Sequence, residues 1–252
     1  SDAFKVLFNG ATTIAGNVTA PAFIGDGSQL TNLPIPLINY SDLTNPILSL
    51  NTNNTGIQSN TNTASGSNAF AVGENTTASG SRSFASGHNT KALGNFSIAM
   101  GSGGSQASGS EAVAIGSQNN ASGNRALALG YNTKADGYAS TAMGNGTTAN
   151  GNESMAIGRS VIASDYASLS IGHFNLSNAS PTNSGSESAP FNLNNTAFVI
   201  GNGTDNNRSD AFKVLFNGAT TIAGNVTAPA FIGDGSQLTN MPLSFNATSG
   251  TG

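Results

Sequence analysis

A glycine recurs every 14 residues through the middle of this chain, and this repeat limits the chain to a few kinds of fold. From Gly66 to Asn178 the sequence divides into eight units of 14 residues, one of which carries an extra residue. Glycine opposes helix, and helical repeats need longer units, so the spacing favours strands joined by turns. The glycines at position 8 of each unit are expected to form these turns: Gly73, Gly87, Gly101, Gly116, Gly130, Gly144, Gly158 and Gly172.

Positions 4 to 7 of each unit alternate between small and large side chains, which is the period-two pattern of a β-strand. No charged residue occurs at positions 4 to 8, so both faces of the strand are expected to be covered. The large side chains at positions 5 and 7 are expected to form the core of the fold. The residues assigned to this core are Phe70, Val72, Ile98, Met100, Val113, Ile115, Leu127, Leu129, Met155 and Ile157.

The small side chains at position 6 form the opposite face of the same strands. Alanine and serine allow the backbone of another chain to approach closely, so we expect this face to pack against copies of the same chain. The predicted interchain face consists of Ala71, Ala85, Ala99, Ala114, Ala128, Ala142 and Ala156, with Ser170 in the last unit.

Each unit is therefore expected to form one coil of a parallel β-solenoid. The coil would contain the strand at positions 4 to 7, the glycine turn and a second short strand that ends in alanine, as at Ala78 and Ala92. Eight coils stacked at the strand spacing of about 4.8 Å would make a rod of roughly 38 Å. The sequence thus predicts an all-β fold.

A second, much longer repeat joins the two ends of the sequence. Residues 1–32 recur without a change at 209–240, an offset of 208 residues. An unchanged copy of this length indicates a tandem array of large modules, of which this chain would be one module and the start of the next. The alternative is an artificial joining of two fragments.

The units AVAIGSQNNASG, SMAIGRSVIASD and ALALGYNTKADG resemble the head repeats of trimeric autotransporter adhesins, the YadA-like head. In that family each unit is one coil of a left-handed parallel β-roll, and three chains associate side by side. The resemblance therefore implies a left-handed, homotrimeric β-roll. Both the hand and the number of chains come from the resemblance and not from the spacing.

The flanks carry a second resemblance. TAFVIGNGTDNNRSDAFKVLFNG and AFIGDGSQLTNLP are similar to connector segments of large trimeric surface fibres and phage-type tail fibres. Residues 197–201 repeat the pattern of positions 4 to 8 and are expected to form a ninth coil. Phe4, Val6 and Phe8 alternate along a predicted strand, and the connectors are expected to be β-segments intertwined between chains.

These observations predict five segments along the chain. They are a β connector at 1–33, an extended Pro- and Asn-rich linker at 34–65, the eight-repeat roll at 66–178, a surface loop and closing coil at 179–208, and at 209–252 a second connector with the start of the next module.

The composition argues against several other functions. Only 8% of the residues are charged, and the eight Lys and Arg residues are scattered, so no nucleic-acid-binding patch is expected. The sequence has no stretch of 18 apolar residues, so no membrane-spanning helix is expected in this fragment. There is no cysteine, and the two histidines, His88 and His173, both occupy the variable position 9.

Carboxylates give no catalytic or metal-binding pattern either. Glu111 and Glu153 share position 3 but lie three coils apart, too far for a catalytic pair. Asp205 and Asp210 are interpreted as solvated turn aspartates rather than calcium ligands. We therefore expect no enzyme activity, no cofactor and no metal.

The function that the sequence predicts is that of a structural module in a long extracellular trimeric fibre or adhesin, at the cell surface, that mediates attachment. Its partners would be copies of itself and a host-cell glycan or protein receptor. The candidate contact residues are Phe96, Tyr131, Tyr138, Tyr166 and Phe174, because exposed aromatic side chains suit such contacts.

Two alternatives stay open at this point. One is the shaft of a phage-like or injection-system tail fibre. The other is an ice- or surface-binding solenoid, which would need an outward row of threonines at position 11. That row contains Thr76, Thr90, Thr133 and Thr147 but is interrupted by other residues.

Overall fold

The computed structural model describes residues 61–176 and 192–230, with residues 232, 236 and 239. It also describes the backbone of four short strands in the N-terminal part. The chain divides into two compact units, Ser1–Asp42 and Leu43–Gly252, and each is described by itself. Most of the predicted linker (residues 34–48, 51–55 and 59–60) and residues 177–191 around the predicted surface loop lie outside the described residues.

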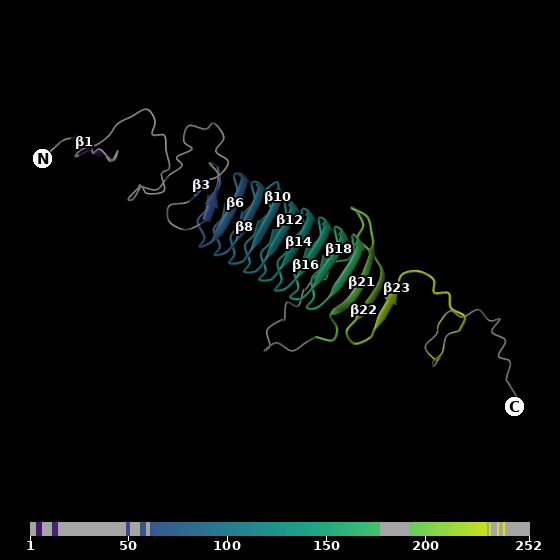
Figure 1. Cartoon of the computed structure of the whole chain (residues 1–252). Coiled ribbons are helices and arrows are strands. Elements are labelled where there is room, and N and C mark those ends of the chain that lie inside the picture. The colour runs from purple at the N-terminus through teal and green to yellow at the C-terminus, as the bar shows by residue number, and fades with distance from the viewer. Residues whose placement is uncertain are drawn as a thin grey trace. The chain divides into compact units, whose positions relative to one another are not determined.

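The second unit contains two sheets that run along a stack of coils (Figure 1). The strands of the 13-stranded sheet are β3 (Ser49–Leu50), β4 (Gly56–Gln58), β6 (Ala69–Glu74), β8 (Phe84–His88), β10 (Ile98–Ser102), β12 (Val113–Ser117), β14 (Leu127–Tyr131), β16 (Thr141–Asn145), β18 (Met155–Arg159), β20 (Leu169–His173), β21 (Thr196–Asn202), β22 (Asp210–Leu215) and β23 (Thr220–Ile222). Those of the 8-stranded sheet are β5 (Thr63–Ala64), β7 (Thr77–Ala78), β9 (Lys91–Ala92), β11 (Gln106–Ala107), β13 (Asn120–Ala121), β15 (Lys134–Ala135), β17 (Thr148–Ala149) and β19 (Ile162–Ala163).

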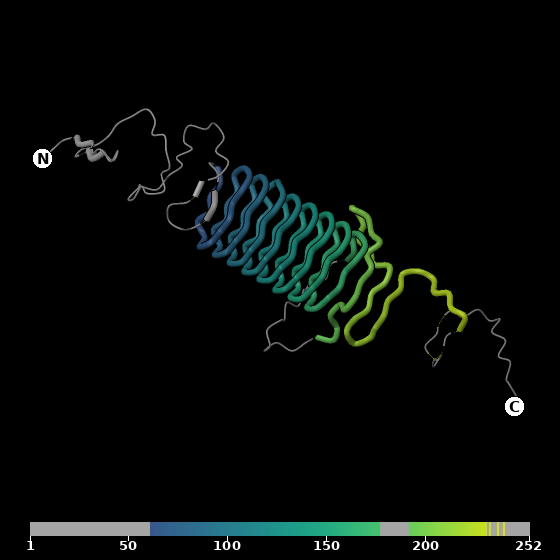
Figure 2. Tube along the Cα trace, in the orientation of Figure 1, coloured from purple at the N-terminus to yellow at the C-terminus, as the bar shows by residue number. Residues whose placement is uncertain are grey.

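Successive coils pair in parallel and in phase with the sequence repeat. Ala114 of β12 lies opposite Ala128 of β14, and Ala121 of β13 lies opposite Ala135 of β15. Figure 2 shows the chain advancing by one coil per repeat. The described residues form no helix. The predicted all-β solenoid of 14-residue coils is therefore confirmed.

The interior of the roll differs from the prediction. The alanines assigned to the interchain face are 0–1% exposed and form the core of a single chain, together with the alanines of the short strands. The large residues assigned to the core lie on the outside of the 13-stranded sheet instead. They are Phe70, Val72, Ile98, Met100, Val113, Ile115, Leu127, Leu129, Met155 and Ile157, each intermediate or exposed. The two faces were assigned the wrong way round.

The physical reason is the short length of the coil. A strand of about five residues and one of two, joined by two tight turns, leave little space between the sheets. Alanine fits in that space at positions 6 and 13, as at Ala128 and Ala135, which are both 0% exposed. Larger side chains would overpack the space between the sheets, so they lie on the outer surface of the 13-stranded sheet.

Each coil turns through left-handed backbone conformations at fixed positions. The residues at positions 3 and 10 have positive φ angles, for example 60° at Arg125 and 52° at Asn132. The glycines at position 8 lie at the ends of the long strands with φ angles of 96–131°. Each of these glycines is the penultimate residue of a long strand and pairs with its counterpart in the next coil, for example Gly116 with Gly130, so it lies just before the turn. Their predicted role as turn residues stays a prediction.

The roll begins one coil earlier than residue 66. Thr63 and Ala64 of β5 pair with Thr77 and Ala78 of β7, and Ala64 is 0% exposed. The predicted boundary between linker and roll is therefore too late. This coil could not be recognised from the repeat because the coil has Ser59 in place of the glycine at position 8.

The ninth coil is confirmed by strand pairing and is followed by an antiparallel cap. Strand β21 pairs in parallel with β20, with Phe198 opposite Leu169 and Gly201 opposite Gly172. Strand β22 then pairs antiparallel with β21, and β23 pairs antiparallel with β22. The parallel stack therefore ends in a two-stranded hairpin, β22–β23, which we call the end cap.

The first unit contains one described element, an antiparallel hairpin of β1 (Phe4–Val6) and β2 (Thr12–Ile14). Phe4 lies opposite Ile14 and Val6 opposite Thr12. The strand predicted from the alternation at Phe4 and Val6 is confirmed, whereas the intertwining of connectors between chains stays a prediction.

Candidate association face and exposed edge

The outer surface of the 13-stranded sheet carries two rows of mostly apolar side chains, interrupted by Ser86 and Thr141. We call this surface, made by positions 5 and 7 of each coil, the apolar face. Met100, Ile115, Met155 and Ile157 on this face are 37–38% exposed. Because a soluble single chain rarely exposes a contiguous apolar patch of this kind, the apolar face is a candidate interface.

Neighbouring coils on the apolar face pack against each other along the stack. The rings of Phe70 and Phe84 are stacked with centroids 5.3 Å apart and planes 6° from parallel. At the other end of the roll, Phe198 and Phe212 have ring centroids 6.0 Å apart. The apolar face thus runs from the first coils to the end cap.

The outer surface of the 8-stranded sheet is polar instead. It presents Lys91, Gln106, Asn120 and Lys134 at position 12 of successive coils. The Lys134 ammonium lies 2.8 Å from a carboxylate oxygen of Asp136. This polar surface can remain in contact with water, whereas the apolar face of the 13-stranded sheet is expected to be buried against a partner.

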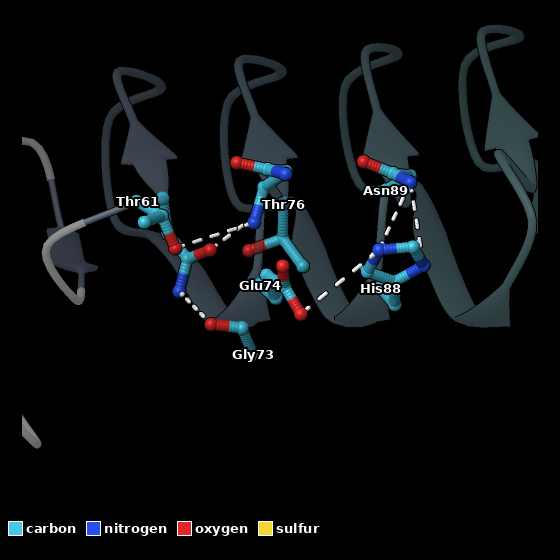
Figure 3. Close-up of polar contacts among 8 residues, drawn as sticks. Thr61, Gly73, Glu74, Thr76, His88 and Asn89 are labelled. Atoms are coloured by element: carbon cyan, nitrogen blue, oxygen red, sulfur yellow. Dashed lines mark hydrogen bonds and ion pairs between the residues drawn. The ribbon is translucent and has the colours of Figure 1, made fainter. Parts of the chain in front are cut away.

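Inside the roll, position 11 carries a row of buried polar residues that connect neighbouring coils. Asn119 donates hydrogen bonds to the carbonyl oxygens of Ile115 at 2.7 Å and Gly130 at 2.8 Å, and it accepts one from the Thr133 amide at 2.9 Å. Near the first coil, the amide of Thr76 donates to Asn62, which in turn donates to the Gly73 carbonyl at 2.9 Å (Figure 3).

The threonines of position 11 lie in this buried row and do not point outward. Thr76, Thr90, Thr133 and Thr147 are 0–1% exposed. An ice- or surface-binding row needs these side chains at the surface, so this alternative loses the feature on which it rested.

The two histidines lie at the surface as predicted for position 9. His88 is 3.9 Å from the Glu74 carboxylate and contacts the Asn89 amide group (Figure 3). A ring nitrogen of His173 is 3.1 Å from the carbonyl oxygen of Gly203. Neither is placed beside a nucleophile by the described contacts.

The turn at positions 2 and 3 forms an exposed edge with aromatic and charged side chains. The Arg82 guanidinium lies 5.2 Å from the ring centroid of Phe96, which is 52% exposed. Arg125 forms an ion pair with Glu111 at 3.1 Å and donates to the hydroxyl of Tyr138.

These contacts change the pKa of two groups on the edge. The hydrogen bond and the charge of Glu111 raise the pKa of Arg125. The hydrogen bond from Tyr166 to Glu153, at 3.1 Å, raises the pKa of the Tyr166 phenol. Glu111 and Glu153 thus each pair with a side chain of the next coil and not with each other.

The predicted contact aromatics divide into three groups in the structure. Phe96 and Tyr138 are exposed on the edge, and Tyr131 is 49% exposed at position 9. Tyr166 is half-buried beside Glu153. Phe174 is only 7% exposed, because the guanidinium groups of Arg159 and Arg208 lie 5.7 and 5.8 Å from its ring centroid, so its prediction as an outward contact is wrong.

A small pocket lies where the roll meets the end cap. Its lining includes Asp165, Val199, Asp210 and Lys213. One oxygen of Asp210 accepts a hydrogen bond from the Leu176 amide at 2.8 Å. Partial burial raises the pKa of Asp210, although this hydrogen bond and the charge of Lys213 oppose the shift. Asp210 is therefore a structural carboxylate and not the solvated one predicted.

The described residues contain no group of three or more acidic or histidine side chains that could hold a metal ion. Nor do they contain a helix of the length and hydrophobicity that a membrane span requires.

A β-solenoid built from tandem coils, with an apolar outer face, is a structural repeat protein. The family model of the YadA head domain repeat matches residues 64–90, 78–103, 107–133 and 135–160. The coils between residues 64 and 160 are therefore YadA-like head repeats, and the resemblance read from the sequence is confirmed for this part of the chain. No curated protein matches the chain.

Proposed function

We propose that this chain is a module of a homotrimeric surface fibre whose task is attachment. The observation that carries the proposal is the different character of the two outer faces of the roll. Three copies that bring their apolar faces together would cover Met100, Ile115 and Ile157 and leave the polar sheets in water. YadA-like heads belong to adhesins that associate in this way, which supports the number three and the left-handed coil.

The exposed edge is the part of the roll that we propose for contact with a receptor. On this edge, Phe96 and Tyr138 each combine a large exposed ring with a neighbouring guanidinium group, and Tyr131 adds an exposed ring at position 9. Such side chains contact proteins and sugars with little loss of conformational freedom. The tail-fibre alternative would use the same rod, and no feature of the described residues favours it.

Light scattering on the purified chain tests the association. A mass near three chains that persists on dilution is expected, because an extended, mostly apolar interface has a slow dissociation rate. A folded particle with the mass of one chain would contradict the proposal, since the apolar face would then be stable in water.

The attachment step is tested separately on the trimer. Beads coated with the protein are incubated with cells and with a panel of immobilised glycans, and the bound fraction is compared with that of a Phe96→Ala, Tyr138→Ala variant. Unchanged mass and reduced binding would support the exposed edge as the contact site. Equal binding of the two proteins would exclude that edge.

A further inference from the structure

The chain contains the end-cap hairpin twice. Strands β1 and β2 repeat the sequence of β22 and β23 at an offset of 208 residues, and they pair in the same register. Phe4 lies opposite Ile14 as Phe212 lies opposite Ile222. Sequence and pairing therefore agree that the two hairpins are the same element.

The second hairpin shows what this element does. Its strand β22 completes the roll by pairing antiparallel with β21, with Lys213 opposite Val199 and Phe212 opposite Ile200. The amide of Phe216 donates to the carbonyl of Asn195 at 3.0 Å.

Three further bonds hold the same junction. The amide of Asn217 donates to the Leu193 carbonyl at 2.8 Å, and that of Ser209 to the Phe174 carbonyl at 3.0 Å. The Asp210 carboxylate accepts from the Leu176 amide. Together these bonds satisfy backbone groups that the last coil would otherwise expose.

The residues through which the end cap makes these bonds all recur in the first hairpin. The counterparts of Ser209, Asp210, Phe212, Phe216 and Asn217 are identical. They are Ser1, Asp2, Phe4, Phe8 and Asn9.

Among the described residues, the first hairpin forms a sheet of two strands, β1 and β2, whereas β22 of the second hairpin also pairs with β21. An isolated two-stranded hairpin is marginally stable in water, and a third strand or other packing is needed to hold it. The roll of the second unit cannot offer its last strand, because β21 is paired with β20 on one edge and with β22 on the other.

We propose that the β1–β2 hairpin is the end cap of another copy of this roll. It takes up a strand equivalent to Thr196–Asn202 of that copy, with Lys5 opposite its Val199 and Phe4 opposite its Ile200. The 208-residue offset fits this partner, since in an array of that period each hairpin follows directly on the closing coil of the module before it. The folded module is then shifted relative to the sequence repeat. Each roll ends in a hairpin whose residues form the beginning of the next sequence repeat.

A two-module protein tests this inference. It consists of residues 1–208 followed by residues 1–252, so that the middle hairpin follows a complete roll. Thr13→Ser in that hairpin alone changes the mass of its peptides and separates them from the other copies. The same substitution in the original chain gives the matched single-module protein, and the proposal is independent of the number of chains in the trimer.

Hydrogen exchange is followed by mass spectrometry on the marked hairpin of both proteins. We expect exchange to slow by at least about tenfold in the two-module protein and to approach the rate of β22–β23. The same rate in both proteins would overturn the proposal, whether that rate is fast or slow. Protection in the single-module protein that grows with concentration would also overturn it, because the hairpins would then pair with one another.

A further variant shows which strand provides the protection. Val199→Pro in the first roll of the two-module protein interrupts β21, since proline cannot donate a hydrogen bond within a central strand. Fast exchange should return in the marked hairpin. Peptides of β14, which both rolls share, should stay in one slowly exchanging population if the first roll remains folded. Continued protection of the hairpin in that folded variant would contradict the proposal.

Discussion

Gly101 and Gly104 lie three residues apart in one coil, and both have positive φ angles, 116° and 86°. A Cβ at Gly101 would overlap the backbone of Gly116 in the next coil, whereas a Cβ at Gly104 would meet no atom within 4 Å. Gly104→Ala should therefore cost about 1 kcal/mol from backbone strain alone. Gly101→Ala should cost at least about 3 kcal/mol, because the clash is added.

Denaturant unfolding of the two variants measures this difference. Since both substitutions change the same residue type at positive φ, the comparison isolates the close approach of successive coils. Equal destabilisation would show that the coils can move apart to accept a methyl group.

Asp210 gives the end cap a dependence on pH. Burial raises the pKa of its carboxyl in the folded protein above the usual value of 3.8. The folded state therefore binds the proton more readily than the unfolded state, and this group destabilises the fold as the pH rises through its folded pKa. The end cap should therefore become more stable as the pH falls from neutral to about pH 4.

Asp210→Asn should remove that dependence while keeping an oxygen for the Leu176 amide. Hydrogen exchange of β22 and β23, corrected for the intrinsic effect of pH on exchange, measures the pH dependence of the end cap in the original protein and in the variant. A variant that retains the full pH response would assign the response to a group other than Asp210.

At the scale of the coil, Asn119 connects neighbouring rungs through buried hydrogen bonds. Asn119→Ala would leave the Gly130 and Ile115 carbonyls and the Thr133 amide without this partner. Each lost bond to a buried group costs about 1–3 kcal/mol, so a loss of several kcal/mol is expected. The adjacent Asn120→Ala, on the outer side of β13, should change stability by less than about 0.5 kcal/mol.

The two faces of β14 should respond oppositely to a change in size. Ala128→Leu places a large side chain in the narrow interior and should destabilise each chain by about 1–3 kcal/mol or more. Leu129→Ala removes only outward apolar area, so the single chain should keep its fold while its association weakens. Circular dichroism on melting, together with the mass of each variant, separates the two effects. A stable, normally associated Ala128→Leu protein would contradict the alanine core.

Much of this element could be predicted from the sequence. The alternation around Ala128 identified the strand, and Gly130 marked its end, because both signals are local. Period two shows which residues share a face but not which face turns inward. That choice depends on the space between the two sheets, which follows from the length of the coil and not from hydrophobicity. Hydrophobicity alone placed Leu127 and Leu129 inside, and this was wrong.

The end of the roll was only partly predictable. The pattern at Phe198 and Ile200 identified the ninth coil, since it repeats the others. The buried position of Phe174 could not be predicted, because its cover includes Arg208, which lies 34 positions away in sequence beyond an insertion. The missing glycine at Ser59 likewise hid the first coil.

For the whole molecule, the apolar face should control association. Ile115→Glu puts a charge in the centre of the proposed interface and should dissociate the proposed trimer, because burying an unpaired carboxylate is costly. Lys91→Glu introduces the same residue on the polar 8-stranded sheet and should leave the mass of the assembly unchanged. Sedimentation of both variants distinguishes these outcomes, and dissociation by Lys91→Glu would place the interface on the other sheet.

The stacked coils also have a mechanical consequence. Their hydrogen bonds run along the axis of the roll, so a pull along that axis loads them one after another. A coil of 14 residues occupies about 5 Å of the stack, yet the same residues span up to about 50 Å when extended. Each coil that yields would therefore add about 45 Å of tether and lower the tension on those still folded. The roll acts in this sense as a store of length, released coil by coil under tension.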